Sequence, residues 1–371
     1  MENMGMSISD SHSNIGKVDA SFWQGKRVFL TGHTGFKGGW LSVWLSSMGA
    51  KVTGYALAPN TNPSFFEVVG LASLLQQNHI ADIRDLSALK SAMEQANPDV
   101  LIHMAAQPLV RYSYENPVET FATNVMGTVN VLESARAINS IKAIVIVTTD
   151  KCYENQEWVW GYRENETLGG ADPYSSSKAC AELVTNAYRQ SFFSGNGTTS
   201  SAAVASARAG NVIGGGDWSQ DRLIPDALAA FEAGKPLVLR NPLATRPWQH
   251  VLEPLSGYLV LAQALFKNGG NFTSAWNFGP GDEGNQTVEQ VIDRLSSQWG
   301  NTVSWQQDPA AQPHEAHLLK LDCSKAHQQL RWVPRWKLVE ATEKIVQWHK
   351  ALQAGKDMKA ITLEQIKQYL G

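Results

Sequence analysis

"TGHTGFKGGW", residues 31–40, is the stretch that decides the fold of this 371-residue chain. Its three glycines have the spacing G-x-x-G-x-x-G, between an apolar run at 26–32 and a helical pattern at 39–50. Glycines let the backbone approach a pyrophosphate, and a helix N-terminus then offers free N–H groups and a positive dipole end. A tight strand–helix turn without a ligand is the alternative, which the flanking strand and helix disfavour.

The residues expected to contact a dinucleotide are Gly32, His33, Thr34, Gly35, Phe36, Lys37 and Gly38. For His33 and Lys37 the alternative is a solvent-exposed loop position.

Apolar runs and helical patterns alternate on both sides of this loop. Strands are expected at 26–32, 51–57, 99–107, 142–149 and 201–214, and helices at 39–50, 86–96, 116–138 and 174–192. The strands are apolar throughout rather than alternating, which is typical of a parallel sheet covered on both faces. With right-handed crossovers, this predicts a Rossmann-like, doubly wound α/β fold.

The rhythm changes after about residue 214, where Pro, Gly, Trp and charged residues become frequent and the helical patterns shorten. We expect a flexible leader at 1–24, a dinucleotide-binding domain at 25–214 with a returning segment near 247–279, and a smaller, interleaved substrate-binding domain at 215–246 and 280–371. The leader has no apolar core typical of a signal peptide, and no apolar run is long enough to span a membrane.

The composition argues against several classes of protein. Hydrophobic residues make up 43%, charged residues 18%, and the net charge is −3, so neither a nucleic-acid surface nor a polybasic membrane patch is indicated. The three cysteines, Cys152, Cys180 and Cys323, are far apart and form no CxxC pair, which fits a reducing cytoplasm. Glu315, His317 and Asp322 match no ligand spacing, and no metal is predicted.

"YSSSK" (174–178) places Tyr174 and Lys178 four residues apart on one helix face. A neutral phenol, with a pKa of about 10, is a poor base at neutral pH. A lysine one turn away and a cationic nicotinamide would favour the phenolate, which can take a proton from a sugar hydroxyl as hydride leaves for the cofactor. A surface pair on a helix is the alternative, which the glycine loop at this distance disfavours.

"TTDKCY" (148–153) closes the apolar run at 142–149 with an acid beside a base. Alone, Asp150 and Lys151 would be interpreted as an exposed ion pair at a strand end. Because they lie between the glycine loop and Tyr174, they are better explained as site residues.

Several motifs occur in a fixed order: "TGHTGFKG", "HMAAQ", "TN.MGT", "TTDKCY", "YSSSK" and "ARAGNVIGGGDW". In this order they resemble the extended short-chain dehydrogenase/reductase family and, within it, the nucleotide-sugar 4,6-dehydratases, over about residues 26–340. Asp150-Lys151 is similar to the members that act on CDP-glucose, whereas those acting on dTDP-glucose and GDP-mannose have Asp-Glu. The alternatives are a nucleotide-sugar 4-epimerase, a dTDP- or GDP-sugar dehydratase, and a regulatory Rossmann protein that senses dinucleotides.

The resemblance implies a hydro-lyase reaction with NAD. Hydride leaves C4 of the glucose, water is lost across C5 and C6, and the hydride returns to C6 to give a 4-keto-6-deoxy sugar nucleotide. Thr149 would polarise the C4 oxygen, Tyr174 would be its base, and Lys178 would hold the nicotinamide ribose. Asp150 would protonate the departing C6 hydroxyl, which requires a raised pKa. Lys151 would be either the C5 base or a stabiliser of the enolate.

The resemblance also implies the binding residues. The further cofactor contacts are Asp82, Ile83, Ala105 and Ala106, and the substrate contacts are Gln107, Asn124, Asn211, Arg222, Arg240 and Arg246. A helix N-cap is the alternative for Asp82, and surface salt bridges are the alternative for Arg222 and Arg240. The second strand, with neither acid nor arginine at 54–62, does not by itself distinguish NAD from NADP.

Four further expectations complete the prediction. The substrate is CDP-glucose, the product serves 3,6-dideoxyhexose synthesis for lipopolysaccharide O-antigen, and the chain is cytoplasmic. Helices at about 114–137 and 174–193 would form the interface of a homodimer or homotetramer.

Overall fold

The computed structural model describes residues 16–194, 201–300, 304–309 and 318–371. In these ranges seven parallel strands form one sheet in the order β11-β6-β5-β4-β1-β2-β3. The strands are β1 (Arg27–Thr31), β2 (Lys51–Ala56), β3 (Gln77–Ile80), β4 (Val100–His103), β5 (Ala143–Val147), β6 (Ala203–Ala209) and β11 (Ala275–Phe278). The predicted Rossmann-like doubly wound sheet is confirmed.

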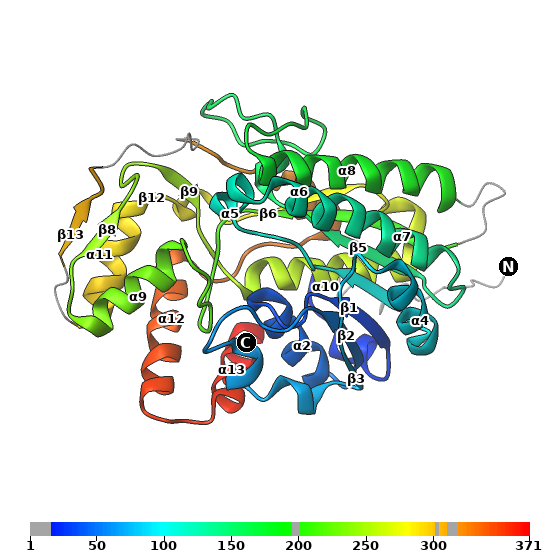
Figure 1. Cartoon of the computed structure of the whole chain (residues 1–371), viewed down its shortest axis with the longest axis horizontal. Helices are drawn as coiled ribbons and strands as arrows, with labels where there is room; N and C mark the ends of the chain where they lie inside the picture. Colours follow the sequence, from blue (N-terminus) through cyan, green and yellow to red (C-terminus); the bar gives the residue numbers. More distant parts are fainter. Residues whose placement is uncertain (1–15, 195–200, 301–303, 310–317) are drawn as a thin grey trace, which may run out of the picture.

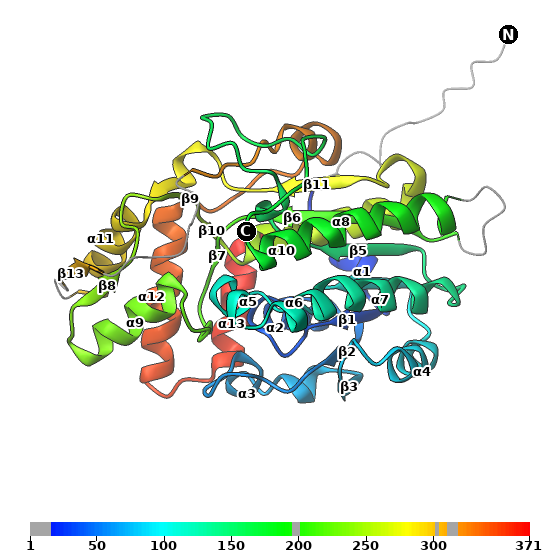
Figure 2. The same cartoon turned by 45° about the horizontal axis from the view of Figure 1, so that its top comes forward.

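Helices cover both faces of the sheet, as Figures 1 and 2 show. One face packs on α2 (Phe36–Ser47), α10 (Leu252–Asn268) and α13 (Met358–Leu370), and the other on α4 (Leu86–Ala96), α7 (Gly127–Arg136) and α8 (Pro173–Phe192). Every residue of β5, "AIVIV", is buried because the strand is covered on both sides. Helix α8 begins at the N-cap Asp172, whose side chain accepts from the Ser175 amide, and has proline in its first turn.

A smaller part lies to one side of the sheet, at the left of Figure 1. Its apolar cluster is formed by α9 (Leu223–Ala233), β8 (Leu237–Leu239), α11 (Val288–Trp299), β13 (Trp305–Gln307) and α12 (Leu338–Gln353). Two short strand pairs join it to the sheet: β7 (Val212–Ile213) with β10 (Gln249–His250), and β9 (Thr245–Pro247) with β12 (Asn285–Thr287). The remaining short elements are α1 (Ala20–Trp23), α3 (Phe65–Val68), η1 (Leu71–Leu74), α5 (Val110–Glu115), α6 (Pro117–Phe121), η2 (Ala122–Met126), η3 (Asp150–Cys152), η4 (Gly269–Asn271), η5 (Asp282–Gly284) and η6 (Ala326–Leu330).

The end of the expected leader is not flexible. Trp23 of α1 is fully buried, and its indole Nε1 donates to Oε1 of Gln263 on α10 at 2.9 Å. The same amide oxygen accepts from the Asp19 backbone N–H at 2.9 Å, and the Gln263 amide nitrogen donates to the Lys17 carbonyl at 3.1 Å. The prediction of a leader over 1–24 is therefore wrong for these last residues, because a buried tryptophan anchors them; residues 1–15 lie outside the described ranges.

Five other elements differ from the sequence expectations. β3 was not predicted, since it is an edge strand of mixed polarity, and β11 joins β6 in parallel from far along the chain. The strand expected at 201–214 divides into β6 and β7, and the helix expected at 116–138 into α6, η2 and α7.

Helix α13, assigned to the substrate-binding domain, packs on α2 in the sheet half. The other domain boundaries stay a prediction.

No helix in the described ranges has both the length and the apolar composition needed to cross a membrane.

Candidate active site

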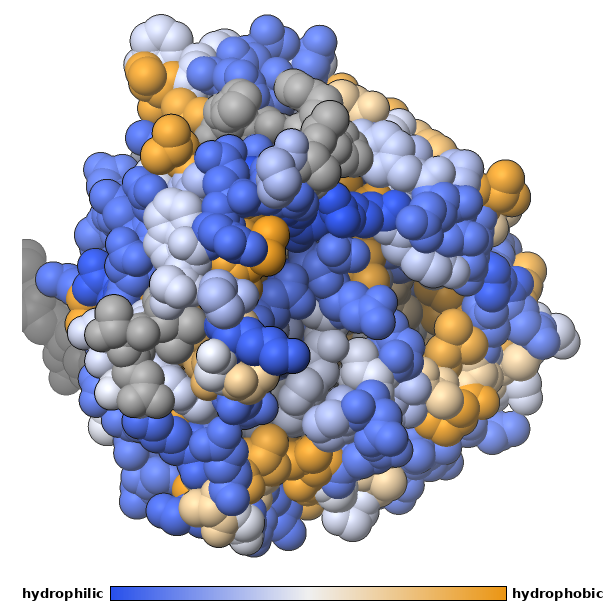
Figure 3. All heavy atoms as spheres, turned by 60° about the vertical axis from the view of Figure 1, so that its left-hand side comes forward, coloured by the Kyte–Doolittle hydropathy of each residue, from blue (hydrophilic) through white to orange (hydrophobic). Residues whose placement is uncertain are grey.

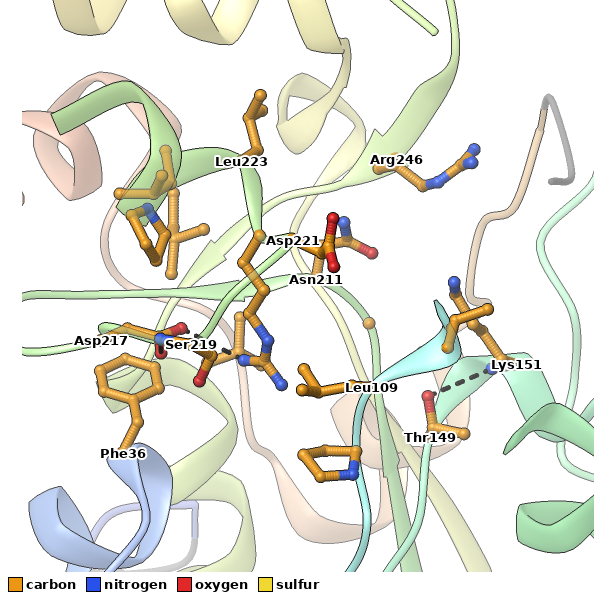
Figure 4. A pocket seen from close by; sticks show the side chains of 18 of the residues that line it. Phe36, Leu109, Thr149, Lys151, Asn211, Asp217, Ser219, Asp221, Leu223 and Arg246 are labelled. Carbon is orange, nitrogen blue, oxygen red and sulfur yellow. Dashed lines mark hydrogen bonds and ion pairs between the residues drawn. The ribbon is translucent and has the colours of Figure 1, made fainter. Parts of the chain in front are cut away.

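The site lies where the strand order reverses. β1 is flanked by β2 and β4, so successive crossovers leave it in opposite directions, and ligands of such sheets bind beyond the carboxyl ends of these strands. A cavity of about 420 Å³ opens there, between the sheet half and the smaller part. The face seen in Figure 3 is mostly hydrophilic around a central hollow. In Figure 4, side chains from the glycine loop (Phe36), the end of β5 (Thr149, Lys151) and the second half (Asn211, Asp217, Arg246) surround one opening.

Most of the predicted site residues line this cavity. They are Gly32, Phe36, Lys37, Gly38, Ala106, Thr149, Asp150, Lys151, Tyr174, Lys178, Asn211, Arg222, Arg240 and Arg246. The predicted residues that do not line it are His33, Thr34, Gly35, Asp82, Ile83, Ala105, Gln107 and Asn124.

The glycine loop fits a dinucleotide phosphate. Gly32 has φ +79°, and a Cβ there would lie 2.7 Å from the Ala105 nitrogen, while a Cβ at Gly38 would overlap the Gly32 carbonyl. Gly35, the exposed N-cap of α2, is different: a Cβ there would meet only the Gly32 carbonyl oxygen, at 3.5 Å. Gly32 and Gly38 are therefore required because the surrounding backbone leaves no room for a side chain. At Gly35 a side chain would fit, but it would occupy the space beside the free N–H groups of α2, where a phosphate could bind.

Tyr174 and Lys178 lie on the same face of α8 and are both almost fully buried. Burial raises the pKa of Tyr174 to about 12, opposed by a hydrogen bond from Thr149 and by the charge of Arg222. Burial lowers the pKa of Lys178 to about 8, opposed by the carboxylate of Glu182, and Lys178 Nζ donates to the Val147 carbonyl at 3.3 Å. Burial alone therefore acts against a tyrosine base, which requires nearby positive charge.

The strand-end turn, residues 149–152, follows β5 after one residue, Thr148. Asp150 is 2% exposed, and its Oδ1 accepts from Thr149 Oγ1 at 3.0 Å. Burial raises the pKa of Asp150, opposed first by Lys151 and then by the Thr149 hydrogen bond and Arg246. This is the direction that a proton donor near neutral pH requires. Lys151 is half-buried and lines the cavity beside it, so Asp150-Lys151 is not an exposed ion pair.

Lys37 reaches from the glycine loop to the buried Tyr258 of α10, with Nζ donating to the phenol oxygen at 3.1 Å. Burial and the charges of Lys178 and Arg222 lower the pKa of Lys37 to about 7, against the charge of Asp150. Lys37 is therefore half-buried in the cavity, and the alternative of an exposed loop residue is wrong. No sequence signal indicated Tyr258.

The predicted phosphate-binding arginines differ in their surroundings. Arg246 is 4% exposed and donates to the Thr245 carbonyl at 2.9 Å. Arg222 pairs with Asp217 at 3.2 Å, and Arg240 pairs with Asp221 at 3.2 Å. The salt bridges considered above as the alternative to phosphate binding by Arg222 and Arg240 are therefore present, and both arginines also line the cavity.

Sequence reasoning missed some charged residues of this wall. Arg111 of α5 also pairs with Asp221, at 3.4 Å, and lies in no motif. Asp217 and Asp221 could have been found, since they stand beside Arg222 in "GDWSQDR".

The side chains of four predicted cofactor residues turn away from the cavity. His33 is buried, with Nε2 2.7 Å from Asn78 Oδ1 and its ring beside Phe66, so solvent exposure is ruled out for it. Thr34 donates to the Leu57 carbonyl at 2.8 Å. Asp82 pairs with Arg84 at 2.6 Å; its alternative role as a helix N-cap is wrong, because Asp85 caps α4. Ile83 packs in the core with α4 and α7.

Gln107 and Asn124 bond to each other rather than facing the cavity. Asn124 Oδ1 accepts from the Gln107 amide at 2.8 Å, and its Nδ2 donates to the Gln107 carbonyl at 3.0 Å and to Ser177 Oγ at 2.9 Å. The Ala105 amide is likewise committed, to Thr31 Oγ1 at 3.1 Å. In this structure these residues shape the loop after β4, and a contact of theirs with substrate stays a prediction.

No cluster of His, Cys, Asp or Glu that could hold a metal ion occurs in the described part of the chain. Glu315 and His317, considered above with Asp322, lie outside the described residues.

The family model "GDP-mannose 4,6 dehydratase" matches residues 29–345. The chain is 57% identical over 354 residues to a CDP-glucose 4,6-dehydratase of Salmonella typhimurium, covering 95% of this chain and 98% of that protein. It is 24% identical over 284 residues to a dTDP-glucose 4,6-dehydratase of Haemophilus influenzae, covering 72% and 81%.

Two solved structures share the fold. A UDP-glucose 4-epimerase of Thermotoga maritima with UDP-glucose has a TM-score of 0.76 at 20% identity, covering 88% of this chain and 99% of that one. A dTDP-glucose 4,6-dehydratase of Bacillus anthracis in complex with NAD has a TM-score of 0.72 at 20% identity, covering 90% and 99%.

Proposed function

The chain belongs to the GDP-mannose 4,6-dehydratase family, and from that premise we propose that it converts CDP-glucose into CDP-4-keto-6-deoxy-glucose with NAD. One observation carries the proposal. The strand-end turn brings a buried acid, Asp150, and a lysine, Lys151, into the same cavity as Tyr174 and Lys178. A 4-epimerase needs only the tyrosine and the lysine of α8, so the added pair favours dehydration. The 57% identity to a CDP-glucose 4,6-dehydratase supports CDP-glucose over other sugar nucleotides.

Each site residue then has one task. When bound, NAD would accept a hydride from C4 of the sugar and return it to C6. Tyr174 takes the proton of the C4 hydroxyl, while the Thr149 hydroxyl, which lines the same cavity, orients the C4 oxygen. Lys178 supplies the positive charge that the buried phenol lacks. Its pKa of about 8 leaves it mostly protonated at neutral pH.

Asp150 and Lys151 serve the elimination of water. The C4 ketone acidifies the C5 proton, which leaves as the C6 hydroxyl departs with a proton from Asp150. The raised pKa of Asp150 keeps that proton available. Lys151, beside it in the cavity wall, either takes the C5 proton or stabilises the enolate charge.

The open side of the cavity would hold the CDP diphosphate. Arg246 is the first candidate, since a planar, two-pronged guanidinium suits phosphate oxygens. Arg222, Arg240 and Asn211 are the further donors.

We extend the proposal to assembly and location. Helices α7 and α8, with α6 and η2, would form the interface of a homodimer or homotetramer, because Val118, Met126 and Leu183 on them are 82%, 53% and 57% exposed. Three unpaired cysteines fit a cytoplasmic enzyme. Its product would supply 3,6-dideoxyhexose synthesis for O-antigen.

A direct assay tests the function. The chain is incubated with NAD and either CDP-glucose or dTDP-glucose in deuterated water, and the 4-keto product is followed by its absorbance in alkali. We expect product from CDP-glucose, with deuterium at C5. Product from dTDP-glucose alone would refute the CDP assignment, and a 4-epimer without C5 deuterium would refute dehydration.

A further inference from the structure

A buried ion pair lies behind the strand-end turn. Arg208 of β6 and Glu182 of α8 meet at 2.8 Å, and their side chains are 3% and 4% exposed. Neither lines the cavity. Burying two charges is costly unless their remaining hydrogen-bonding groups are also satisfied, so the partners of this pair indicate what it is for.

Glu182 holds the beginning of the turn. Its Oε1 accepts from Thr148 Oγ1 at 2.5 Å, and its Oε2 accepts from Ser206 Oγ at 2.6 Å as well as from Arg208. Thr148 immediately precedes the turn. Glu182 also lies one helical turn beyond Lys178, whose pKa it raises against the effect of burial.

Arg208 holds the end of the same turn. Its Nη1 donates to the Tyr153 hydroxyl at 2.8 Å and to the Glu164 carbonyl at 3.1 Å, and its guanidinium lies 4.9 Å from the centre of the Tyr153 ring. The Tyr153 hydroxyl in turn donates to Asn277 Oδ1 of β11 at 2.7 Å. Tyr153 immediately follows the turn, so one ion pair reaches both of its ends.

The turn itself has weak internal bonds. The Lys151 amide donates to Thr149 Oγ1 at 3.3 Å, and the Cys152 and Tyr153 amides donate to the Thr149 and Asp150 carbonyls, both at 3.4 Å. These distances exceed the usual range for N–H···O bonds. Outside the turn, the Cys152 carbonyl accepts from the Gly169 amide at 2.9 Å. Apart from the bond from Thr149 Oγ1 to Asp150 Oδ1 at 3.0 Å, the position of the turn therefore depends largely on what holds the flanking residues.

We propose that the Glu182–Arg208 pair, acting through Thr148 and Tyr153, positions Asp150 and Lys151 for the elimination step. This inference rests on the proposed function. Arg208 and Tyr153 are positioning residues, because they act on substrate only through the turn, whereas Glu182 acts through the turn and also through the charge of Lys178. Tyr174 is carried by α8 and its backbone N–H donates to Ser113, and Thr149 lies at the opposite end of the turn from Tyr153, so C4 oxidation depends less on the Arg208–Tyr153 contact than elimination does.

Tyr153→Phe separates the two steps, because it removes the hydroxyl and keeps the ring. We expect elimination to slow about tenfold, since small misplacements of reacting groups cost that much or more, with C4 oxidation nearly unchanged. Rapid mixing of the NAD-loaded enzyme with CDP-glucose measures both: reduced nicotinamide by its near-ultraviolet absorbance, and the 4-keto product in alkali. Reduced nicotinamide should accumulate in the variant.

Tyr162→Phe is the matched control. Tyr162 stacks on Tyr153 at 5.1 Å, but its hydroxyl bonds to Asn155 and Gln156, away from the ion pair. We expect it to keep the wild-type ratio of the two rates. Arg208→Lys keeps the positive charge but loses the planar set of donors, so it should behave like Tyr153→Phe.

Amide hydrogen exchange of residues 149–153 tests the positioning without any reaction. It should be faster in Tyr153→Phe than in Tyr162→Phe. Equal slowing of both chemical steps, or the same exchange in both variants, would overturn the inference. If the wild-type chain makes no product from CDP-glucose, the proposed function fails, while the exchange comparison still decides whether the pair holds the turn.

Discussion

The two walls of the cavity are built in opposite ways. On the sheet side, Tyr174 and Asp150 are 8% and 2% exposed and stand on α8 and at the end of β5. On the other side, Arg111 and Arg240 have side chains 41% and 29% exposed and share the carboxylate of Asp221, whose side chain is 47% exposed. The sheet side is rigid and buried, and the arginine side is open and already paired.

This difference indicates that the buried sheet side carries out proton transfer and that the open arginine side binds and releases the diphosphate. Burial shifts the pKa values of Lys178 and Asp150 toward neutrality, as proton transfer near neutral pH requires, and it makes the Tyr174 base depend on the charge of Lys178. Exposed ion pairs are worth only about 0–1 kcal/mol, so a diphosphate can replace Asp221 on its arginines at little cost. The predictions below test this division, from the largest expected effect to the smallest.

Tyr174→Phe should lower kcat by about 10³, because it removes the base for the C4 hydroxyl from the rigid wall. The measurement is the rate of 4-keto product from CDP-glucose. Tyr188→Phe is the control on the same helix, where the hydroxyl lies 3.4 Å from Glu133. A loss of less than about tenfold would mean that another group on this wall takes the proton.

Lys151→Met should lower elimination by about 10²–10³ and leave C4 oxidation possible, because it removes the cation beside Asp150. Reduced nicotinamide should then build up on mixing with CDP-glucose. Lys142→Met, at the exposed beginning of the run that forms β5, should behave as wild type. Normal turnover of Lys151→Met would show that the role given to Lys151 is wrong.

Activity should fall about tenfold per pH unit above pH 8, since Lys178, whose pKa is lowered to about 8, loses its proton there and no longer supports the phenolate. Loss of the Asp150 proton acts in the same direction. When activity is expressed relative to its maximum, the decrease should begin at a higher pH in Lys178→Arg; an unchanged midpoint would show that Lys178 is not the group that titrates.

Arg246→Lys should raise KM for CDP-glucose about tenfold, because a buried two-pronged donor is lost. Arg240→Lys should raise KM only about twofold, since Arg240 is exposed and exchanges one ion pair for another. Initial rates over a range of substrate concentrations measure both. Equal effects would remove the distinction between buried and exposed arginines within the open wall.

The sheet wall was largely predictable, because its residues follow local rules. The glycine spacing, the apolar run before residues 148–153 and the four-residue separation of Tyr174 and Lys178 are all short-range patterns, and the structure brings them to one cavity. β3 escaped prediction because an edge strand of mixed polarity has no apolar run, and β11 because its partner β6 is remote in sequence.

The open wall was less predictable, because its contacts are made between distant segments. Nothing near Arg111 indicates that it meets Asp221. The same limit applies outside the open wall: nothing near Gln107 indicates that its backbone amide donates to Asn124, and the ring of His33, in the glycine loop, turns to Asn78, where Gly54 leaves room for it. For each of these residues, the direction of the group depends on a partner that is distant in sequence. A motif, which is a short-range pattern, does not reveal that partner.

Trp23 limits how far a recombinant version could be trimmed. A truncation just before β1 would preserve every motif of the glycine loop and look harmless in an alignment. It would also remove the Trp23 indole and the backbone groups that hydrogen-bond to the Gln263 side chain. The side-chain amide of Gln263 on α10 would then lose these hydrogen bonds. A well-folded fragment should therefore retain the chain from Lys17 onward, because proteolytic cleavage between Asp19 and Arg27 would separate from the rest of the chain the residues that bind Gln263 of α10.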